Sequence, residues 1–175
     1  MKIIRVHAEQ PCRIGVTLTG PLEGPHDQLT LAQGRHDEAE QMYRRALAIF
    51  ERAYGPGHYE IAINLNNLAG VRHAQGHPDE AEALYQRALS IKESLLGVDH
   101  PDVAMTLNNL ALLLASTGRG QAAEPLYERA QRIFTASLER GHPKIRACID
   151  NYAALLRELG KGAAARALER KYGND

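Results

Sequence analysis

Asparagine side chains recur along the chain at a fixed step of 42 residues, in the series Asn66-Asn67, Asn108-Asn109 and Asp150-Asn151. A carboxamide offers two hydrogen-bond donors and an acceptor, so it can pair with the backbone of another chain whatever that chain's side chains are. A line of such groups, one per repeated unit, would hold an extended peptide in register. The alternative is structural: because buried amides must be satisfied, some of them would tie one helix to the next unit.

Histidine recurs at the same step, at His58, His100 and His142. Three histidines would suit zinc only if their side chains converged within a few ångströms. In a stacked repeat, equivalent positions are instead separated by on the order of 10 Å per packed helix layer. We therefore expect no metal and no cofactor, and we predict that each histidine hydrogen-bonds its own turn.

Motifs of catalysis do not accompany these side chains. The sequence has no phosphate-binding glycine loop, no nucleophile elbow and no HExxH pattern. The hydroxyls of Ser116 and Ser137 and the thiol of Cys148 have no base placed by a recognisable motif. Carboxylate pairs such as Asp79-Glu80 stand where a helix begins, which the helix dipole explains. We expect a protein that is not an enzyme.

Charge and composition narrow the range of partners. Lys+Arg and Asp+Glu balance at 21 each, so no overall field attracts nucleic acid or an anionic membrane. No apolar run approaches the roughly 18 residues of a membrane span. The two cysteines, Cys12 and Cys148, match neither a disulfide framework nor a metal-ligand spacing. These features predict a cytoplasmic protein that binds neither nucleic acid nor membrane.

The elements that position the asparagines follow from glycines at the same 42-residue step, which are Gly34, Gly76, Gly118 and Gly160. Residues 61–102 match residues 103–144 at 17 of 42 positions without a gap. Self-similarity at such a period is the signature of a stacked repeat protein. Apolar residues at helical spacing predict two helices per unit, A and B, which in the second unit cover about 59–75 and 78–96. Glycine ends helix A, and His77-Pro78 opens helix B.

The same pattern predicts helices at about 101–117, 121–139, 143–159 and 161–171. The last of these is short and rich in alanine, as suits a terminal cap. The fold class is therefore an all-α solenoid of antiparallel helix pairs over residues 28–172, with units at about 28–57, 58–99, 100–141 and 142–172. Small residues such as Ala88 and Ala130 are expected to let neighbouring helices approach closely.

The first unit departs from the pattern. Its helix B is predicted from His36 to about Tyr54, but residues 20–33, where helix A belongs, contain two prolines and two glycines. Only residues 28–33 are expected to form a turn or two. Residues 1–27 match nothing in the repeat and are predicted to be an irregular or disordered leader. The apolar face of this helix B is then partly exposed, which makes it a candidate interface.

The residues that recur are those of a known family. The pattern L-N-N-L-A, then G, A-E, L/M-Y-x-R-A-L and D-H-P, resembles the tetratricopeptide repeat in the 42-residue form typical of kinesin light chains. The resemblance covers about residues 29–170. It implies a right-handed superhelix of about three to four repeats, whose A helices line a concave groove that binds a protein partner as an extended peptide or a helix.

The family pattern also implies which side chains face that groove: Ile63, Asn66, Asn67, His73, Met105, Asn108, Asn109, Leu112, Asn151 and Arg157. The asparagines would bond the peptide backbone, while Met105 and Leu112 would supply an apolar wall. On this interpretation, Asn109→Ala is expected to weaken peptide capture with little loss of melting temperature.

One departure from the family bears on the ligand. Kinesin light chain repeats often carry a lysine shortly before the glycine and favour acidic peptides, whereas the matching positions here are Ala74, Ser116 and Glu158. With only Arg72, His73 and Arg157 to lend positive charge, we expect a mixed or more apolar peptide. The alternative function is a self-associating regulatory or scaffold segment, which would form a homo-oligomer through its exposed first or last repeat.

Overall fold

The structure, a computed structural model, describes residues 25–172, and describes side chains for residues 34–172. The described residues form seven α-helices and no strand, which confirms the all-α class. The helices are α1 (Pro25–Tyr54), α2 (Tyr59–Ala74), α3 (Pro78–Leu96), α4 (Pro101–Ser116), α5 (Gly120–Ser137), α6 (Pro143–Glu158) and α7 (Gly162–Tyr172).

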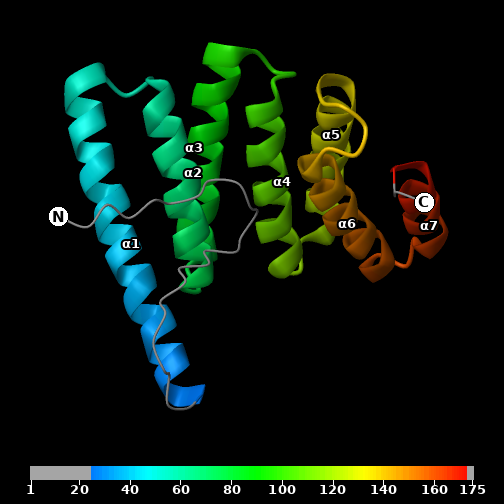
Figure 1. Cartoon of the computed structure of the whole chain (residues 1–175), viewed down its shortest axis with the longest axis horizontal. Helices are drawn as coiled ribbons and strands as arrows, with labels where there is room; N and C mark the ends of the chain where they lie inside the picture. Colours follow the sequence, from blue (N-terminus) through cyan, green and yellow to red (C-terminus); the bar gives the residue numbers. More distant parts are fainter. Residues whose placement is uncertain (1–24, 173–175) are drawn as a thin grey trace.

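The helices stand side by side in chain order from α1 to α7 (Figure 1). The A helices are α2, α4 and α6, and the B helices are α1, α3, α5 and α7. Within each of the last three units, helix B folds back on helix A after a short turn. The B helices α1, α3 and α5 also pack against the A helix that follows each of them. This alternation is the solenoid expected from the repeat.

Glycine ends each A helix in the left-handed conformation. Gly76, Gly118 and Gly160 have φ angles of 79°, 77° and 74°. The backbone N–H of the residue after the glycine then bonds back to a carbonyl in the last turn, as at His77 to Arg72, where the distance is 2.9 Å. These bonds satisfy carbonyls that the helix leaves open, so the sequence interpretation of these three glycines is confirmed.

Gly34 behaves differently, and the expectation that it stops a helix was wrong. The helix α1 runs without a break from Pro25 to Tyr54, through Gly34. A glycine inside a helix costs only about 1 kcal/mol relative to alanine. Neither proline nor glycine opens a new helix after Gly34, in contrast to Pro78, Gly120 and Gly162, so nothing forces the chain to turn. The expected leader boundary at residue 27 therefore falls inside α1, while residues 1–24 lie outside the described part of the chain.

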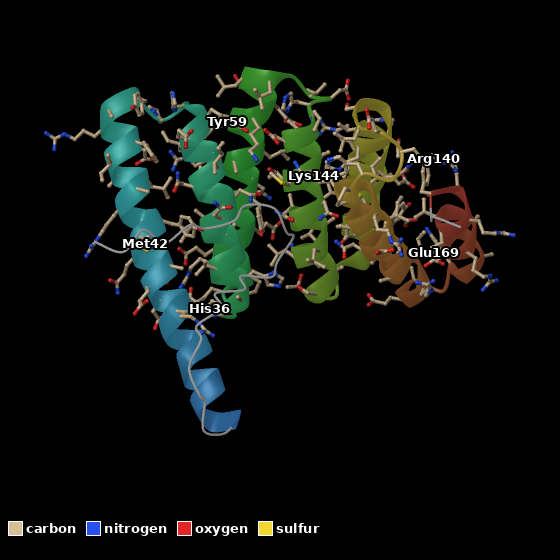
Figure 2. All side chains as sticks on the ribbon, in the orientation of Figure 1. His36, Met42, Tyr59, Arg140, Lys144 and Glu169 are labelled. Carbon is tan, nitrogen blue, oxygen red and sulfur yellow. The ribbon has the colours of Figure 1, made fainter. Side chains whose placement is uncertain are left out.

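The core lies where A and B helices cross. Alanines at these crossings are fully buried, including Ala81 and Ala88 of α3 and Ala123 and Ala130 of α5. Side chains fill the space between adjacent helices along the whole row (Figure 2). Because a small side chain lets two backbones approach, the large residues Tyr85, Tyr127 and Leu107 close the gaps around each crossing.

Candidate functional site

Five asparagines join the three A helices through one row of side-chain hydrogen bonds. Within a helix, Asn66 Nδ2 donates to Asn67 Oδ1 and Asn108 Nδ2 donates to Asn109 Oδ1, both at 3.5 Å. Between helices, Asn109 Nδ2 donates to Asn66 Oδ1 at 3.3 Å, and Asn151 Nδ2 donates to Asn108 Oδ1 at 3.4 Å. We call these five residues the amide row. Its bonds are long, so each is individually weak.

The amide row is continuous because contacting side chains are separated in sequence by one residue more than the length of the repeat. The sequence repeats every 42 residues, but side chains on neighbouring A helices meet at a separation of 43. The second asparagine of one unit therefore meets the first asparagine of the unit before it. A pair in each unit is what makes the row continuous, since a single asparagine would have no amide partner.

The row has spare hydrogen-bonding capacity. Each carboxamide has two N–H donors and two acceptor lone pairs, of which the row uses at most one each. Asn66, Asn108 and Asn109 are buried, whereas Asn67 and Asn151 at the two ends are half-buried. These asparagines therefore have the structural role that the sequence suggested as an alternative. Each bonds the side-chain amide of a neighbouring asparagine, however, and not the backbone of the next unit. The ends are the members of the row best placed to meet a ligand.

Apolar side chains flank the amide row on the same helices. Ile63 of α2 and Met105 of α4 hold equivalent positions one turn before the asparagine pairs, and both are half-buried. Met105 and Leu112 pack against the main core while keeping part of their surface open. They therefore supply apolar surface beside polar amides.

The C-terminal ends of the A helices carry little free positive charge. His73 Nε2 lies 2.9 Å from Ser116 Oγ, and because that hydroxyl donates to the Leu113 carbonyl, His73 is the donor. Burial lowers the pKa of His73, which favours its neutral form. Arg157 is exposed but pairs with Glu169 of α7 at 2.5 Å.

Arg72 does not serve the groove as expected. Its guanidinium lies between two carboxylates of B helices, 3.1 Å from Glu40 and 2.7 Å from Glu80. The side chain is only 14% exposed, so its charge is used in joining α2 to α1 and α3. The A helices therefore present a face that is close to neutral.

Comparison with known families decides the class of protein. A family model described as tetratricopeptide repeat matches residues 28–94 and 102–172, which together are most of the chain. The chain belongs to the tetratricopeptide repeat family. A comparison with curated protein sequences finds no significant match.

Solved structures of similar shape are tetratricopeptide arrays of the kinesin light chain type. BtubC (BKLC) from P. vanneervenii is 27% identical with a TM-score of 0.73, over 79% of this chain and 56% of that one. A putative kinesin light chain with nearly identical TPR-like repeats from Podosopora anserina is 23% identical with a TM-score of 0.72, over 84% and 71%. A second structure, of a variant of that protein, gives 23% and 0.73, over 84% and 70%. The chain thus spans little more than half the length of BtubC, and the Podosopora likeness concerns the fold alone.

Tetratricopeptide repeats generally act as protein-interaction modules, and the recurring histidines serve that scaffold. The Nδ1 atoms of His58, His100 and His142 accept hydrogen bonds from the backbone N–H two residues later, at 3.3, 3.1 and 3.1 Å. Each histidine is the N-cap of an A helix, where free backbone donors need an acceptor. The prediction that each histidine bonds its own turn is confirmed. Among the described residues, no three His, Cys, Asp or Glu side chains gather in a group able to hold a metal ion.

A buried lysine was missed by the sequence reasoning. Lys92 of α3 is 1% exposed, and its Nζ donates to Thr106 Oγ1 at 3.0 Å and to the Asp102 carbonyl at 3.3 Å. Burial lowers the pKa of Lys92 to about 8, partly offset by the Asp102 carboxylate. The sequence did contain a sign of this contact, because the equivalent positions one repeat away on either side are Phe50 and Phe134. A charged residue at an apolar repeat position marks an unusual contact.

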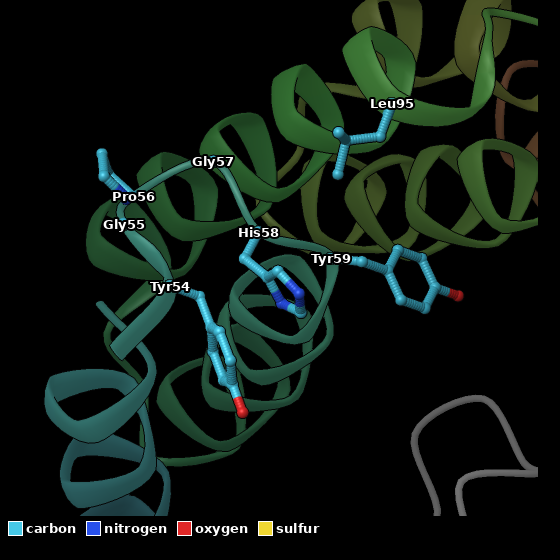
Figure 3. A pocket seen from close by; sticks show the side chains of 7 residues that line it. All are labelled: Tyr54, Gly55, Pro56, Gly57, His58, Tyr59 and Leu95. Carbon is cyan, nitrogen blue, oxygen red and sulfur yellow. The ribbon is translucent and has the colours of Figure 1, made fainter. Parts of the chain in front are cut away.

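A shallow pocket of about 440 Å³ lies away from the amide row, where α1 turns into α2. The turn from Gly55 to Gly57 and Leu95 of α3 line it, and the rings of Tyr54 and His58 stack with centroids 4.5 Å apart (Figure 3). Because His58 also caps α2, its ring is held by the fold. The polar groups of His58 and Tyr59 in this pocket are already engaged, because His58 Nδ1 accepts from the Glu60 N–H and the Tyr59 hydroxyl donates to Asp102.

The buried thiol of Cys148 is poorly suited to chemistry. Burial raises the pKa of Cys148 to about 12, so the thiol stays protonated near neutral pH, whereas the thiolate is the nucleophile. The side chain belongs to the apolar core of the array.

None of the helices in the described part of the chain combines the length and the apolar character needed to cross a lipid bilayer.

Proposed function

We propose that this tetratricopeptide array is a non-enzymatic module that binds an extended peptide or a partner helix along the face formed by α2, α4 and α6. The observation that carries the proposal is the amide row. Its donors and acceptors are held in line by one another, so they lose little conformational freedom when a ligand arrives. Backbone amides of an extended chain offer the complementary groups.

The ligand that suits this face has few charges. His73 is bonded to Ser116, while Arg72 and Arg157 are paired with carboxylates. The half-buried side chains of Met105 and Leu112 favour apolar groups beside the backbone. The expectation of a mixed or apolar peptide therefore gains support. The cytoplasmic location stays a prediction.

The test is a selection of random peptides on the immobilised full chain, followed by affinity measurements with variants. Asn67→Ala and Asn151→Ala remove the half-buried ends of the row while the Asn109–Asn66 bond between α2 and α4 remains. Each is expected to weaken binding about fivefold, because one lost hydrogen bond is worth about 1 kcal/mol. Gln86→Ala is the matched control, because Gln86 is an exposed amide on the B helix α3.

Two results would contradict the proposal. Selected peptides that bind the Asn67 and Asn151 variants as tightly as the wild type would place the binding site elsewhere. Equal losses for Gln86→Ala would show that the effect does not depend on the A-helix face.

A second candidate function, self-association through the first repeat, is favoured by one observation on α1. Ile49 is 63% exposed, whereas its equivalent Ile133 is 2% exposed. Met42 is 49% exposed, whereas its equivalents Leu84 and Leu126 pack against the core. In α3 and α5, helix A of the same unit covers this face, but no described helix covers it in α1.

The occupant that we infer for this face is α1 of a second copy. Met42 and Ile49 lie two turns apart on one face with the small Ala46 between them. An antiparallel copy would therefore set each Met42 against the Ile49 of its copy, which is the arrangement that a two-fold axis requires. Sedimentation equilibrium should show a dimer that Ile49→Glu abolishes, whereas Leu95→Glu, a similar change at a 50% exposed site, leaves it intact. A monomer at all concentrations would rule out this candidate.

A further inference from the structure

A second cleft lies between the B helices α5 and α7, with α6 beneath them. Its volume is about 1080 Å³, and it is open to solvent. Tyr152 and Leu156 of α6 form its floor, while Pro125 of α5 and Leu168 of α7 line its sides. Arg132 and Lys171 also line it, so apolar surface and positive charge occur together.

The cleft lies where a recurring ion pair of the array is missing. Arg87 of α3 pairs with Glu51 of α1 at 2.5 Å, and one repeat later Arg129 of α5 pairs with Glu93 of α3 at 2.7 Å. These pairs join consecutive B helices. One repeat further, the basic residue is Lys171 of α7.

The acidic position of that third pair is held by Thr135, which has no carboxylate. Lys171 consequently has no carboxylate partner among residues 34–172; its Nζ lies 5.0 Å from the ring centroid of Tyr172 instead. The contact that joins α1 to α3 and α3 to α5 is therefore incomplete between α5 and α7.

The other charges of the cleft are already engaged. Glu124 pairs with Lys161 at 2.7 Å, and Glu128 accepts a hydrogen bond from the Tyr152 hydroxyl at 3.0 Å. In the part of the chain that the structure describes, Arg132, like Lys171, has no ion-pair partner. The cleft thus combines an apolar floor with two cations that have no ion-pair partner among the described residues. Glu124 lies near the start of α5 and is paired, whereas Glu128 lies in the middle of the helix, one turn before Arg132.

We propose that this cleft binds an acidic peptide segment, whose carboxylate takes the position that Glu51 and Glu93 hold in the other units. Apolar side chains next to that carboxylate would rest on Leu156 and Leu168. A cleft open to solvent suits a chain that passes through it better than a small molecule, which needs to be largely enclosed. The site is separate from the amide row, because Leu156 and Asn151 lie on different faces of α6.

The probe is a fluorescein-labelled peptide of the sequence Ser-Leu-Glu-Leu-Glu-Ser, compared with the same peptide carrying glutamine in place of both glutamates. Fluorescence anisotropy with the full chain should show saturable binding of the acidic peptide. The glutamine peptide should bind about fivefold or more weakly, since exposed ion pairs are individually modest. Higher salt should reduce this difference.

Thr135→Glu tests the origin of the site. It restores the acidic residue of the repeat, so the new carboxylate should pair with Lys171 and reduce binding of the acidic peptide at least tenfold while the melting temperature holds or rises. Ala136→Glu is the matched control, because it adds the same charge at the next position, which is exposed and does not line the cleft. Lys171→Gln should weaken binding without the added negative charge.

The proposal fails if the acidic peptide does not bind, or if the two peptides bind equally. It also fails if Thr135→Glu, with its melting temperature preserved, binds the acidic peptide as well as Ala136→Glu does. Binding that survives Thr135→Glu but is lost in Asn67→Ala would assign the peptide to the A-helix face instead.

Discussion

Consecutive units of the array are joined differently on its two sides. Along the A helices, the contacts that link one unit to the next are mainly neutral hydrogen bonds, those of the amide row and the His73–Ser116 pair. The Tyr59 hydroxyl of α2 also donates to the Asp102 carboxylate of α4. Along the B helices the linking contacts are ion pairs, including Arg87–Glu51 and Arg119–Glu82 at 2.5 Å each. The first set is largely sheltered from water, and the second is exposed.

Because of this difference, the ion pairs that help to hold the units together lie on the B side, apart from the A-helix face that we propose binds a ligand. Exposed ion pairs contribute little individually and weaken in salt, but they keep charges on the B side. The A side carries mainly carboxamides and apolar side chains, which can meet a ligand backbone without a large desolvation cost. Its exposed charges include Arg146 and Asp150 of α6, which lie 3.8 Å apart as an ion pair. Changes of salt concentration, pH or single side chains should therefore change the free energy of unfolding by different amounts for contacts on the two sides.

The largest effect is expected at Lys92, a B-helix charge that is buried instead of exposed. Lys92→Met should raise the free energy of unfolding at pH 7 by about 2 kcal/mol, because a flexible apolar side chain of similar length removes the cost of burying a charge. Denaturant unfolding monitored by circular dichroism measures the change. Phe134→Met, at the equivalent position of the next unit, is the control and should lower stability, because Phe134 is buried in the apolar core and the smaller side chain fills less of its site.

The same residue predicts a pH dependence. The pKa of Lys92 is about 8 in the folded chain against an ordinary value of 10.5, so between these values the unfolded chain binds more protons. Stability of the wild type should therefore rise as the pH increases from about 8 to about 10.5, and the advantage of Lys92→Met should shrink over that window. A difference between the two proteins that stays constant from about pH 7 to about pH 10 would contradict this account.

A smaller effect is expected in the interior of the amide row. Asn109→Ala should lower the free energy of unfolding by about 1 kcal/mol, because it leaves Asn66 Oδ1 and Asn108 Nδ2 without their partners. The structure thereby revises the expectation that this change spares the melting temperature. Asn67→Ala, at the end of the row, should cost less. A loss that is equal for both variants would mean that the row does not act as a connected unit.

The smallest effect is expected for an exposed ion pair. Arg87→Gln should cost less than about 1 kcal/mol at low salt and almost nothing in about 1 M sodium chloride, where screening acts over about 3 Å. The loss caused by Asn109→Ala should persist at that salt concentration. Thermal unfolding of both variants at two salt concentrations provides the comparison, and a salt-independent loss for Arg87→Gln would contradict it.

The repeated helices were predictable because each carries its own start and stop signals. Gly76, Gly118 and Gly160 combine with a following proline or glycine, and the apolar spacing between them is helical. Gly34 carries the same glycine without the restart signal, and position alone misassigned it. Whether a glycine ends a helix depends on the residues that follow it, and His36 stands where Pro78, Gly120 and Gly162 follow the other three glycines.

The amide row was predictable only in part. The asparagine pairs stand out in the sequence, but their partners depend on how far one helix slides past the next. That offset, 43 residues rather than 42, is set by packing between units. The environment of Lys92 likewise depends on Thr106 and the Asp102 carbonyl in the following unit. Contacts between units arise from geometry that no single repeat contains.

The hydrogen bonds of the amide row all run the same way along the array. Followed from donor to acceptor, they lead from Asn151 to Asn108, then through Asn109 to Asn66, and finally to Asn67. The row therefore ends in spare N–H groups at Asn67 and in a spare carbonyl oxygen at Asn151. A polypeptide lying beside it would meet an electropositive terminus and an electronegative one, so its two possible orientations would differ in energy. The amide row is therefore polar along its length, and it favours one orientation of a bound polypeptide over the other.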